Sequence, residues 1–560
     1  MYRTSIALFT ALLAVPTIAA AAGSVMLPAS GQTACYDSAG NPRGCAGTGE
    51  DGEKRAGLPW PAPRFVAGEA TVTDSLTGLV WTRHANAPDI NAAPPFVCTN
   101  AEGDMSWQQA LAHVACLNSN SFAGFSDWRL PNLNELESMV NAGAADPSGY
   151  LSANGFGPGG LATLVQPSAY WSSTSDASFN DSAWDVHFLS GDYPFGSVKT
   201  PLLAGLDTRA VWPVRGSSGA VVSLPQTGQR LCFSAAGAEI DCDGSGQDGE
   251  LRAGVSIPEP RFKAGTQARF TLDRLTGLVW STDSRTPGVG SPPPAGCAVG
   301  GSQLDWQQAL DHVACLNRSN YLGKSDWRLP NRNELRSLAD YSNGAPALAG
   351  EHPFADLLSG DAFWSSTSDA ASPGRAWTVN LIDGGVSSSG KAGGALLPVW
   401  PVTGPDLALP TVAIAGGDLT INVSSRSIGG TVEEGAEVTV AVNGGTPAAA
   451  QVAGSTWSYT VNALSAGANN VTATASDFSE NRSSAAIGIT FIVPDGKVAG
   501  ADAVTIADAL MALRFVVGLA VPSEMQLLRG DVAPLGAPDG RITLTDTLLI
   551  LRKSVALESF

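Results

Sequence analysis

Apolar residues recur at helical spacing in two separate stretches of the chain. The first stretch carries Trp107, Ala110, Leu111, Val114 and Leu117, and the second carries Trp306, Ala309, Leu310, Val313 and Leu316. Steps of three and four residues place each set on one face of a helix. Ser106 and Asp305, which immediately precede the two stretches, are favoured N-cap residues. The pattern therefore predicts two equivalent amphipathic helices.

A second helix is predicted after each Trp-Arg-Leu-Pro motif. Asn132 precedes Glu135 by three residues, and Asn331 precedes Glu334 by the same distance. This is capping-box spacing, in which each side chain accepts a hydrogen bond from the backbone amide of the other residue. We therefore expect Glu135 and Glu334 to cap helices rather than to act as catalytic acids.

The later part of each stretch alternates between apolar and polar positions, as strands do. The expected strands lie at 170–174, 183–186 and 211–214, and again at 363–367, 376–379 and 399–402. Helices come first and a strand-rich half follows. This order predicts an α+β module whose two ends meet in one sheet.

These elements occur twice because the chain carries one sequence twice. Residues 74–81 return as 273–280 with an offset of 199, and the Trp-Arg-Leu-Pro motif has the same offset. Solenoid and propeller repeats reach only about 50 residues, so this is a duplicated domain. We assign residues 33–216 to copy 1 and 230–404 to copy 2. Two copies of one surface favour binding or display over catalysis.

Residues 405–494 have a different pattern, poor in Cys and aromatic residues. Short alternating segments lie between Gly-rich turns, at 420–423, 436–442, 456–461 and 470–475. This pattern is typical of an all-β sandwich. The phrases around Gly430, Trp457 and Ala475 resemble bacterial immunoglobulin-like domains of surface proteins, which implies a spacer.

The start of the chain indicates export. Arg3 is followed by a short apolar run at 6–15 and by small residues at 19–22, which together form a signal peptide over residues 1–22. No Cys follows the expected cleavage site, so a lipoprotein anchor is unsupported. No later apolar run reaches the roughly 20 residues of a transmembrane helix. We expect a secreted protein, extracellular or on the cell surface, with the periplasm as an alternative.

The composition limits which classes of partner the chain can bind. The net charge is -19, charged residues make up 15% of the chain, and there are 63 glycines. Nucleic acid and anionic lipid both require clustered Lys and Arg, so neither is expected as a partner. An acidic, Gly-rich chain suits a β-rich exported protein that collects divalent cations.

Eight cysteines follow the duplication, with spacings of 10 and 18 residues in both copies. An even count at repeated spacing in an exported chain indicates disulfides. If each copy folds on its own, three pairings per copy are open. Closure of short loops favours Cys35 with Cys45, Cys98 with Cys116, Cys232 with Cys242, and Cys297 with Cys315. Zinc is disfavoured, since the chain has no CxxC or HxxxH spacing.

Five ordered motifs in each copy resemble the Lcl C-terminal domain family. They are Thr-Gly-Leu-Val-Trp, the Trp-x-x-Ala-Leu helix, Asp-Trp-Arg-Leu-Pro-Asn-x-x-Glu-Leu, Trp-Ser-Ser-Thr and a closing Pro-Val. The resemblance implies a fold related to C-type lectins and formylglycine-generating enzymes. It also implies adhesion, because the founding member of the family is an adhesin that binds glycosaminoglycans. Arg215 ends the last motif in copy 1 and Thr403 ends it in copy 2, so the copies need not be equivalent.

The candidate catalytic residues have simpler structural explanations. The motif serines lack a nearby His in sequence and a Gly-x-Ser-x-Gly elbow; they are Ser172, Ser173, Ser365 and Ser366. The Asp-Trp-Arg motifs offer two acid–base pairs, Asp127 with Arg129 and Asp326 with Arg328. A structural ion pair beside a buried Trp is the simpler role for each. We therefore expect no catalytic residue, and the sequence does not identify the ligand-binding residues.

The C-terminal segment, 495–560, carries a second duplication. Residues 508–514 and 546–552 both run from Asp through mostly apolar residues to Arg, 38 residues apart. The segment resembles a dockerin-type pair of calcium loops and helices. This implies Ca2+ as the cofactor and a cohesin-like protein as a partner, although Ile506 and Leu544 depart from the residues that dockerins often carry there.

The second loop of this segment has the clearer calcium pattern. Asp539, Gly540 and Asp546 match positions five, six and twelve of an EF-hand loop, where oxygens surround the ion and Gly allows a sharp turn. The expected ligands are Asp531, Asp539, the backbone carbonyl of Arg541, and Asp546.

The first loop leaves its register open. Asp495 and Asp502 have the same spacing as Asp539 and Asp546, whereas alignment of the two helices makes Asp508 the last ligand. The alternative for both loops is an acidic turn that only caps a helix.

The sequence thus favours a secreted or surface-associated adhesion protein. The predicted fold class is multidomain: two α+β C-type-lectin-like modules, one all-β immunoglobulin-like sandwich, and one small α-helical EF-hand or dockerin-like module. The ligand would be an extracellular carbohydrate or a surface protein. A structural component of an extracellular assembly is the second hypothesis, and an enzyme of unknown reaction is the third.

Overall fold

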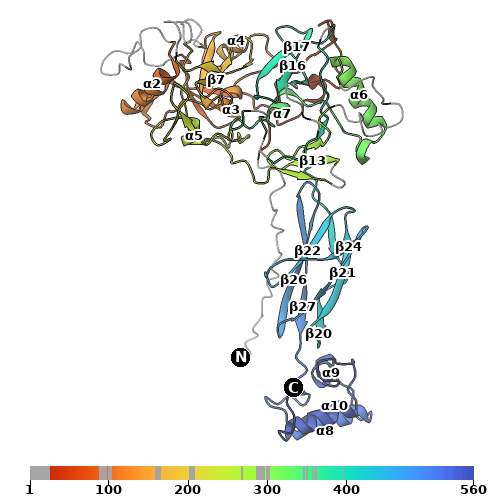
Figure 1. The fold of residues 1–560 in the computed structure, drawn as a ribbon. Helices are drawn as coiled ribbons and strands as arrows, with labels where there is room; N and C mark the ends of the chain where they lie inside the picture. Colours follow the sequence, from red (N-terminus) through yellow and green to blue (C-terminus); the bar gives the residue numbers. More distant parts are fainter. Residues whose placement is uncertain are drawn as a thin grey trace, which may run out of the picture. The chain divides into compact units, whose positions relative to one another are not determined.

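The computed structural model describes residues 25–86, 98, 104–157, 165–193, 195–200, 208–265, 269–285, 297, 303–344, 347–348, 351–355, 357, 362–393 and 395–560 (Figure 1). The chain divides into two compact units, of which one is Ala22–Asp406 and the other contains Leu407–Phe560. The predicted signal peptide, 1–22, lies outside the described residues. Within the described ranges, no helix combines the length and the apolar character needed to cross a bilayer.

Copy 1 consists of an arm, defined here as residues 25–58, and a body that follows it. The arm holds β1 (Cys35–Tyr36), β2 (Pro42–Arg43) and α1 (Asp51–Lys54). The body holds β3 (Phe65–Ala67), β4 (Thr71–Asp74), β5 (Val80–Thr82), α2 (Trp107–Ser119), α3 (Leu133–Glu137), α4 (Pro147–Leu151), β6 (Ala169–Ser175), β7 (Ser182–His187), β8 (Ser197–Val198) and β9 (Val214–Arg215).

Copy 2 repeats this order. Its arm, residues 222–255, holds β10 (Cys232–Phe233), β11 (Glu239–Ile240) and α5 (Asp248–Leu251). Its body holds β12 (Phe262–Ala264), β13 (Phe270–Asp273), β14 (Val279–Ser281), α6 (Trp306–Arg318), α7 (Arg332–Arg336), β15 (Ala362–Ser368), β16 (Arg375–Asn380), β17 (Val386–Gly390) and β18 (Val402–Thr403).

The ends of each body meet in one sheet, as the sequence predicts. β9 pairs with β5 in a sheet of order β3-β4-β5-β9, and β18 pairs with β14 in a sheet of order β12-β13-β14-β18. A second sheet of three strands, β6-β7-β8 or β15-β16-β17, completes each body.

The predicted helix starts are confirmed. Ser106 and Asp305 are the N-caps of α2 and α6. At α3, the Asn132 side chain accepts from the Glu135 amide at 2.9 Å, while the Glu135 carboxylate accepts from the Asn132 amide at 3.0 Å. The Asn331–Glu334 box of α7 has the same arrangement. These caps satisfy amides that the first turn of a helix leaves unpaired.

All four predicted disulfides are confirmed: Cys35–Cys45, Cys98–Cys116, Cys232–Cys242 and Cys297–Cys315. The bridges span 10 or 18 residues. Two of them close the arm hairpins, which are too small to have a core of their own.

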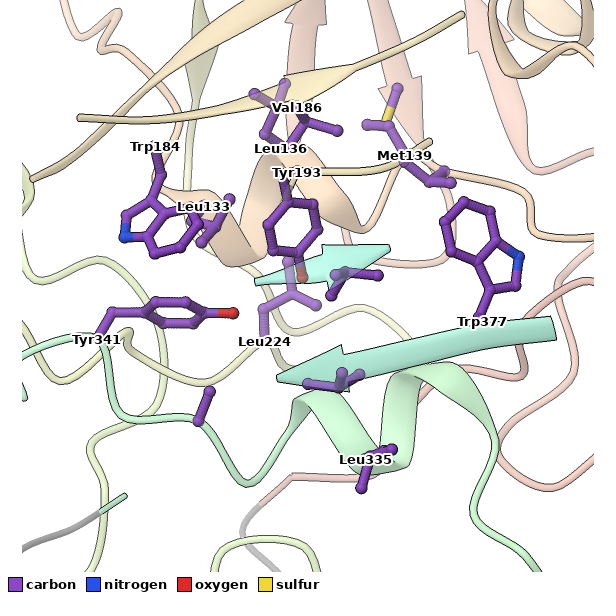
Figure 2. Packing of buried hydrophobic residues seen from close by; sticks show 14 of the residues in the cluster. Leu133, Leu136, Met139, Trp184, Val186, Tyr193, Leu224, Leu335, Tyr341 and Trp377 are labelled. Carbon is purple, nitrogen blue, oxygen red and sulfur yellow. The ribbon is translucent and has the colours of Figure 1, made fainter. Parts of the chain in front are cut away.

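The sequence treats each copy as a separate domain, whereas in the structure the two copies share one core. One cluster of buried apolar residues runs through both bodies (Figure 2). Trp184 of copy 1 meets Tyr341 of copy 2 edge-on, with ring centroids 5.6 Å apart. Because the apolar faces of α3 and α7 are covered by this common core, the two copies form a single compact unit.

The unit that contains Leu407–Phe560 begins with two sheets that enclose a separate core around Trp457. Their strands are β19 (Val412–Ile414), β20 (Leu419–Ile421), β21 (Arg426–Val432), β22 (Glu437–Val442), β23 (Ala448–Ala449), β24 (Gln451–Ala453), β25 (Thr456–Val461), β26 (Gly467–Ser476) and β27 (Arg482–Phe491). This stretch is all-β, in agreement with the alternating pattern.

The same unit ends in three helices, α8 (Ile506–Val516), α9 (Glu524–Gly530) and α10 (Leu544–Ser554). Their buried core is small, with Val498, Ala509, Ala512, Val532 and Ile550 at its centre. So small a core supplies little stability, and polar contacts in the loops carry more of the fold.

Candidate functional site

Each arm packs against the body of the other copy. Gln32 of arm 1 and Ser368 of copy 2 exchange two hydrogen bonds, each 2.7 Å long. Gln229 of arm 2 and Ser175 of copy 1 exchange the equivalent pair, at 2.6 and 3.0 Å. The two arms are therefore reciprocally exchanged, and a cleft between an arm and the body of the other copy contains residues of both copies.

A buried carboxylate fixes each arm in place. Asp51 Oδ2 accepts from Ser30 Oγ at 2.5 Å within its own arm and from Thr367 Oγ1 at 2.6 Å in the other copy. Asp248 makes the equivalent contacts with Thr227 and Thr174. Burial raises the pKa of both carboxyl groups to about 6.

The Trp-Ser-Ser-Thr motif of each body supplies the hydroxyl group that binds the carboxylate of the exchanged arm. Thr174 and Thr367 bind the arm carboxylates, while Ser172 donates to the backbone oxygen of Trp184 at 2.8 Å. Ser365 donates in the same way to Trp377 at 2.7 Å. The motif hydroxyls are buried and engaged in contacts that hold strands and arms together.

The Asp-Trp-Arg residues form ion pairs, but with partners other than each other. Arg129 pairs with Glu135 at 2.6 Å, so the capping residue of α3 has two roles. Asp127 pairs with Arg215 at 2.7 Å. The suggested Asp127–Arg129 pair is therefore replaced by two separate pairs.

Copy 2 keeps the inner pair and changes the outer one. Arg328 pairs with Glu334 at 2.6 Å. Thr403 stands where copy 1 has Arg215, and its hydroxyl donates to Asp326 at 2.5 Å. The change from Arg215 to Thr403 thus replaces an ion pair with a hydrogen bond from the neutral hydroxyl of a shorter side chain.

Two clefts lie between an arm and a helix of the other copy, at equivalent positions. The cleft between arm 1 and α6 is about 240 Å³ and is lined by Arg43, Lys54 and Asp311 among others. The cleft between arm 2 and α2 is about 530 Å³, and Ile240, Leu251 and Ala112 stand at the corresponding positions. The first of these arm–helix clefts is charged, whereas the second presents apolar side chains at the same places.

A third cleft, of about 690 Å³, lies where arm 2 meets the body of copy 2; we call it the Ile257 cleft. It is lined by Gly228, Arg230, Ile257, Pro258, Glu259, Pro260, Arg261, Asp340, Ser342, Asn343 and Glu351. Sequence reasoning missed these residues. Alignment of the two copies would have shown that Trp60 occupies the position of Ile257 in copy 1.

Buried charges that the sequence did not single out link the two copies. Arg332 of copy 2 pairs with Glu137 of copy 1 at 2.7 Å, and both side chains are about 1% exposed. Burial raises the pKa of Glu137, although two arginines oppose this effect.

A second buried charge, Lys199 of copy 1, lies 4.5 Å from the Trp107 ring and 5.6 Å from the Phe233 ring of arm 2. Burial lowers its pKa to about 8.

The second predicted calcium loop is closed by hydrogen bonds from backbone amides. Asp531 accepts from the amides of Asp539 and Gly540, at 3.1 and 2.7 Å. Asp546 accepts from the amides of Val532 and Ala533, at 2.8 and 2.6 Å. The exposed Asp539 side chain accepts from the amide of Arg541 at 3.1 Å. A bound calcium ion would compete with these donors for the same oxygens.

The three candidate calcium ligands of the first loop have different surroundings. Asp495 pairs with Arg529 at 2.5 Å, Asp502 is exposed, and Asp508 accepts from the amides of Ala499 and Thr505 at 2.7 and 2.8 Å. Throughout the described part of the chain, no three His, Cys, Asp or Glu residues form a group suited to hold a metal ion. Calcium binding in both loops stays a prediction.

Comparison with known proteins identifies the two bodies. The model of the Lcl C-terminal domain matches residues 70–215 and 269–403, which exclude both arms. No curated protein matches the chain.

Several solved structures match parts of the chain. An engineered protein is 20% identical, with 16% of this chain and 21% of that chain covered and a TM-score of 0.14. Fibronectin(III)-like modules of Clostridium thermocellum CbhA are 19% identical, with coverages of 21% and 60% and a TM-score of 0.16. A polysaccharide lyase is 14% identical, with coverages of 21% and 19% and a TM-score of 0.13. The chain spans less than two thirds of each of these structures.

Proposed function

We propose, on the premise that the chain belongs to the Lcl C-terminal domain family, that it is a secreted or surface-associated adhesion protein. Its two copies form one binding head, which recognises a carbohydrate or another extracellular ligand. The observation that carries this proposal is the set of open clefts beside the exchanged arms. The motif serines and the Asp-Trp-Arg residues, by contrast, are engaged in structural contacts.

Cleft size and lining agree with binding. Ligand sites are concave, about 300 to 1,000 Å³, with apolar walls and a few polar groups that orient the ligand. The cleft between arm 2 and α2 and the Ile257 cleft fall within this range, at about 530 and 690 Å³. The family resemblance to C-type lectins adds a second reason to propose a carbohydrate ligand. We assign the all-β segment to an immunoglobulin-like spacer.

A scaffold function is the second candidate, favoured by the C-terminal helices. α8 exposes Ile506, Leu510 and Leu513, and α10 exposes Leu544, Leu548 and Leu551 at matching positions; the residues that follow the two helices, Val517 and Val555, are also exposed. Soluble proteins rarely leave such a contiguous apolar face uncovered. This face supports attachment to a cohesin-like partner, while the calcium loops would stabilise the helices that present it.

A glycan-array screen of residues 25–560 tests the adhesion proposal. We expect binding to a defined set of saccharides that is lost after thermal unfolding of the same sample. If no saccharide binds above the unfolded control, the adhesion proposal fails and the scaffold function becomes the better explanation.

A further inference from the structure

We propose that the Ile257 cleft is the saccharide site of the head, that it takes a neutral saccharide, and that its counterpart in copy 1 is closed. This inference rests on the adhesion function proposed above. The duplication suggests two equivalent binding sites, whereas this inference gives one site per chain.

The counterpart in copy 1 is filled by Trp60. Residues 60–64 of copy 1 align with 257–261 of copy 2, so Trp60 takes the place of Ile257. The Trp60 indole donates to the backbone oxygen of Ala29 at 2.8 Å, which fixes the ring. A Cβ atom on Gly31 would lie 3.2 Å from the Trp60 ring. Gly228, the counterpart of Gly31, lines the open cleft in copy 2.

Neighbouring groups hold the Trp60 ring over this position. The guanidinium of Arg64 stacks 4.2 Å from its centroid, and the Tyr150 ring lies 6.1 Å away. Arg261, the counterpart of Arg64, lines the cleft and makes the equivalent buried ion pair, with Asp273. The same backbone frame is therefore closed by aromatic packing in copy 1 and left open by the smaller Ile257 in copy 2.

The open cleft has the two kinds of surface that a sugar ring requires. Ile257, Pro258 and Pro260 offer apolar contact for the C–H face of a ring. The groups that can bind hydroxyls are Arg230, Glu259, Asp340, Ser342, Asn343 and Glu351. Asp340 Oδ1 accepts from Ser342 Oγ at 2.6 Å and from the Ser342 amide at 3.0 Å, which fixes the orientation of its carboxylate.

The charges of the cleft select against an anionic ligand. Arg261 is buried in an ion pair with Asp273 at 2.8 Å, and Arg230 pairs with Glu259 at 2.9 Å. Asp340 and Glu351 add two more carboxylates to the lining. A sulfated or carboxylated sugar would bring like charges together, whereas hydroxyls can donate to these carboxylates.

The test uses residues 25–560 and measures binding of cellohexaose, xylohexaose, mannohexaose and chitohexaose by calorimetry, with heparin and polygalacturonate as anionic probes. Ile257→Trp introduces the residue that closes the cleft in copy 1. Leu396→Trp, the same enlargement at an exposed residue of copy 2 that lines none of the three clefts, is the matched control. We expect the neutral probe that binds best to lose at least tenfold in affinity in Ile257→Trp and to keep its affinity in Leu396→Trp.

A second variant keeps the test valid if Ile257→Trp fails to fold, as judged by near-ultraviolet circular dichroism. Asp340→Asn preserves the acceptor for the Ser342 contacts and removes one charge, and we expect it to weaken the same probe at least threefold. Saccharide binding that is unchanged in the folded variants, or that is restricted to the anionic probes, would overturn the site while leaving the adhesion function standing. If no probe binds to the original chain, this inference fails, and a negative glycan array would separately show that the adhesion function fails.

Discussion

Tyr193 and Val386 occupy the same position in the two copies, and they pair with each other. The Tyr193 amide donates to Val386 O at 3.0 Å, and the Val386 amide donates to Tyr193 O at 3.1 Å. Each residue lies two positions after an equivalent glycine, Gly191 or Gly384. A contact between equivalent residues places them on a pseudo-two-fold axis. The two copies are therefore arranged as the subunits of a symmetric dimer that is joined into one chain.

This arrangement predicts that the head survives a cut between its copies. We expect a protease site inserted after the exposed Ser217 to yield two halves that co-elute as one species under native conditions. The common core and the exchanged arms hold the halves together. Size-exclusion chromatography with light scattering makes the comparison, and the uncut insertion variant is the control. Separation of the halves without denaturant would contradict the pseudo-dimer.

The buried ion pair between the copies predicts a large loss of stability. Glu137→Gln leaves Arg332 and Arg336 without their buried counter-charge, and loss of one partner costs about 3–5 kcal/mol. Urea unfolding followed by Trp fluorescence measures this loss of stability. The signal reports mainly on the head, because Trp457 is the only Trp outside residues 22–406. Glu259→Gln, which removes half of the exposed pair with Arg230, should cost less than about 1 kcal/mol. Equal effects of the two variants would refute a stabilising role for the inner pair.

Local features of the fold were predictable, and the exchange of the arms was not. Ser106 and Asn132 determine their helix caps within three residues, and short loop closure determines the pairing of Cys35 with Cys45. The contact of Gln32 with Ser368 joins residues 336 positions apart. Because Gln229 gives arm 2 the same chemistry, the sequence alone does not show which body receives which arm.

The candidate site was predictable only in part, for the same reason. The sequence shows that Trp60 corresponds to Ile257, yet only the structure places the Trp60 ring beside Gly31 and Ile257 in the wall of a cleft. Nothing in the sequence distinguishes the buried carboxylates of the arms from other acidic residues. Asp51 lies at the start of α1, and its partner Thr367 belongs to the other copy.

The pKa of these arm carboxylates predicts how the stability of the head depends on pH. Burial raises the pKa of Asp51 and Asp248 from 3.8 to about 6. A raised pKa in the folded state means that the stabilising contribution is full below pH 4 and is lost as the pH rises through 6. Each carboxyl group should therefore make the head less stable at pH 7 than at pH 4, by roughly 3 kcal/mol.

The Asp51→Asn/Asp248→Asn variant isolates this effect from the other titrating groups. We expect the stability of the double variant, relative to the original protein, to increase between pH 4 and pH 7. Chemical unfolding at five or more pH values across this range measures the difference. Asp37→Asn is the control, because that carboxyl is exposed and its pKa is lowered by contacts with Asn41. A difference that stays constant with pH would show that the arm carboxylates do not titrate in this range.

The last prediction concerns calcium and the C-terminal helices. Burial, and to a smaller extent the charge of Asp546, raises the pKa of Asp531. A divalent cation would relieve the cost of holding both carboxylates inside the loop, so we expect calcium to slow amide hydrogen exchange in α8 and α10 relative to a chelator. Asp546→Ala should speed exchange under both conditions, because it also removes acceptors for the amides of Val532 and Ala533.

Asp539→Ala separates the calcium contribution from the structural one. Its exposed side chain accepts only a local hydrogen bond from the amide of Arg541, so its loss should leave exchange in chelator nearly unchanged and weaken the calcium response. Asp508→Ala and Asp502→Ala test the two registers of the first loop in the same way. If α8 and α10 of the unmodified chain exchange identically with calcium and with chelator, these carboxylates serve only as acceptors for the backbone amides that close the loops.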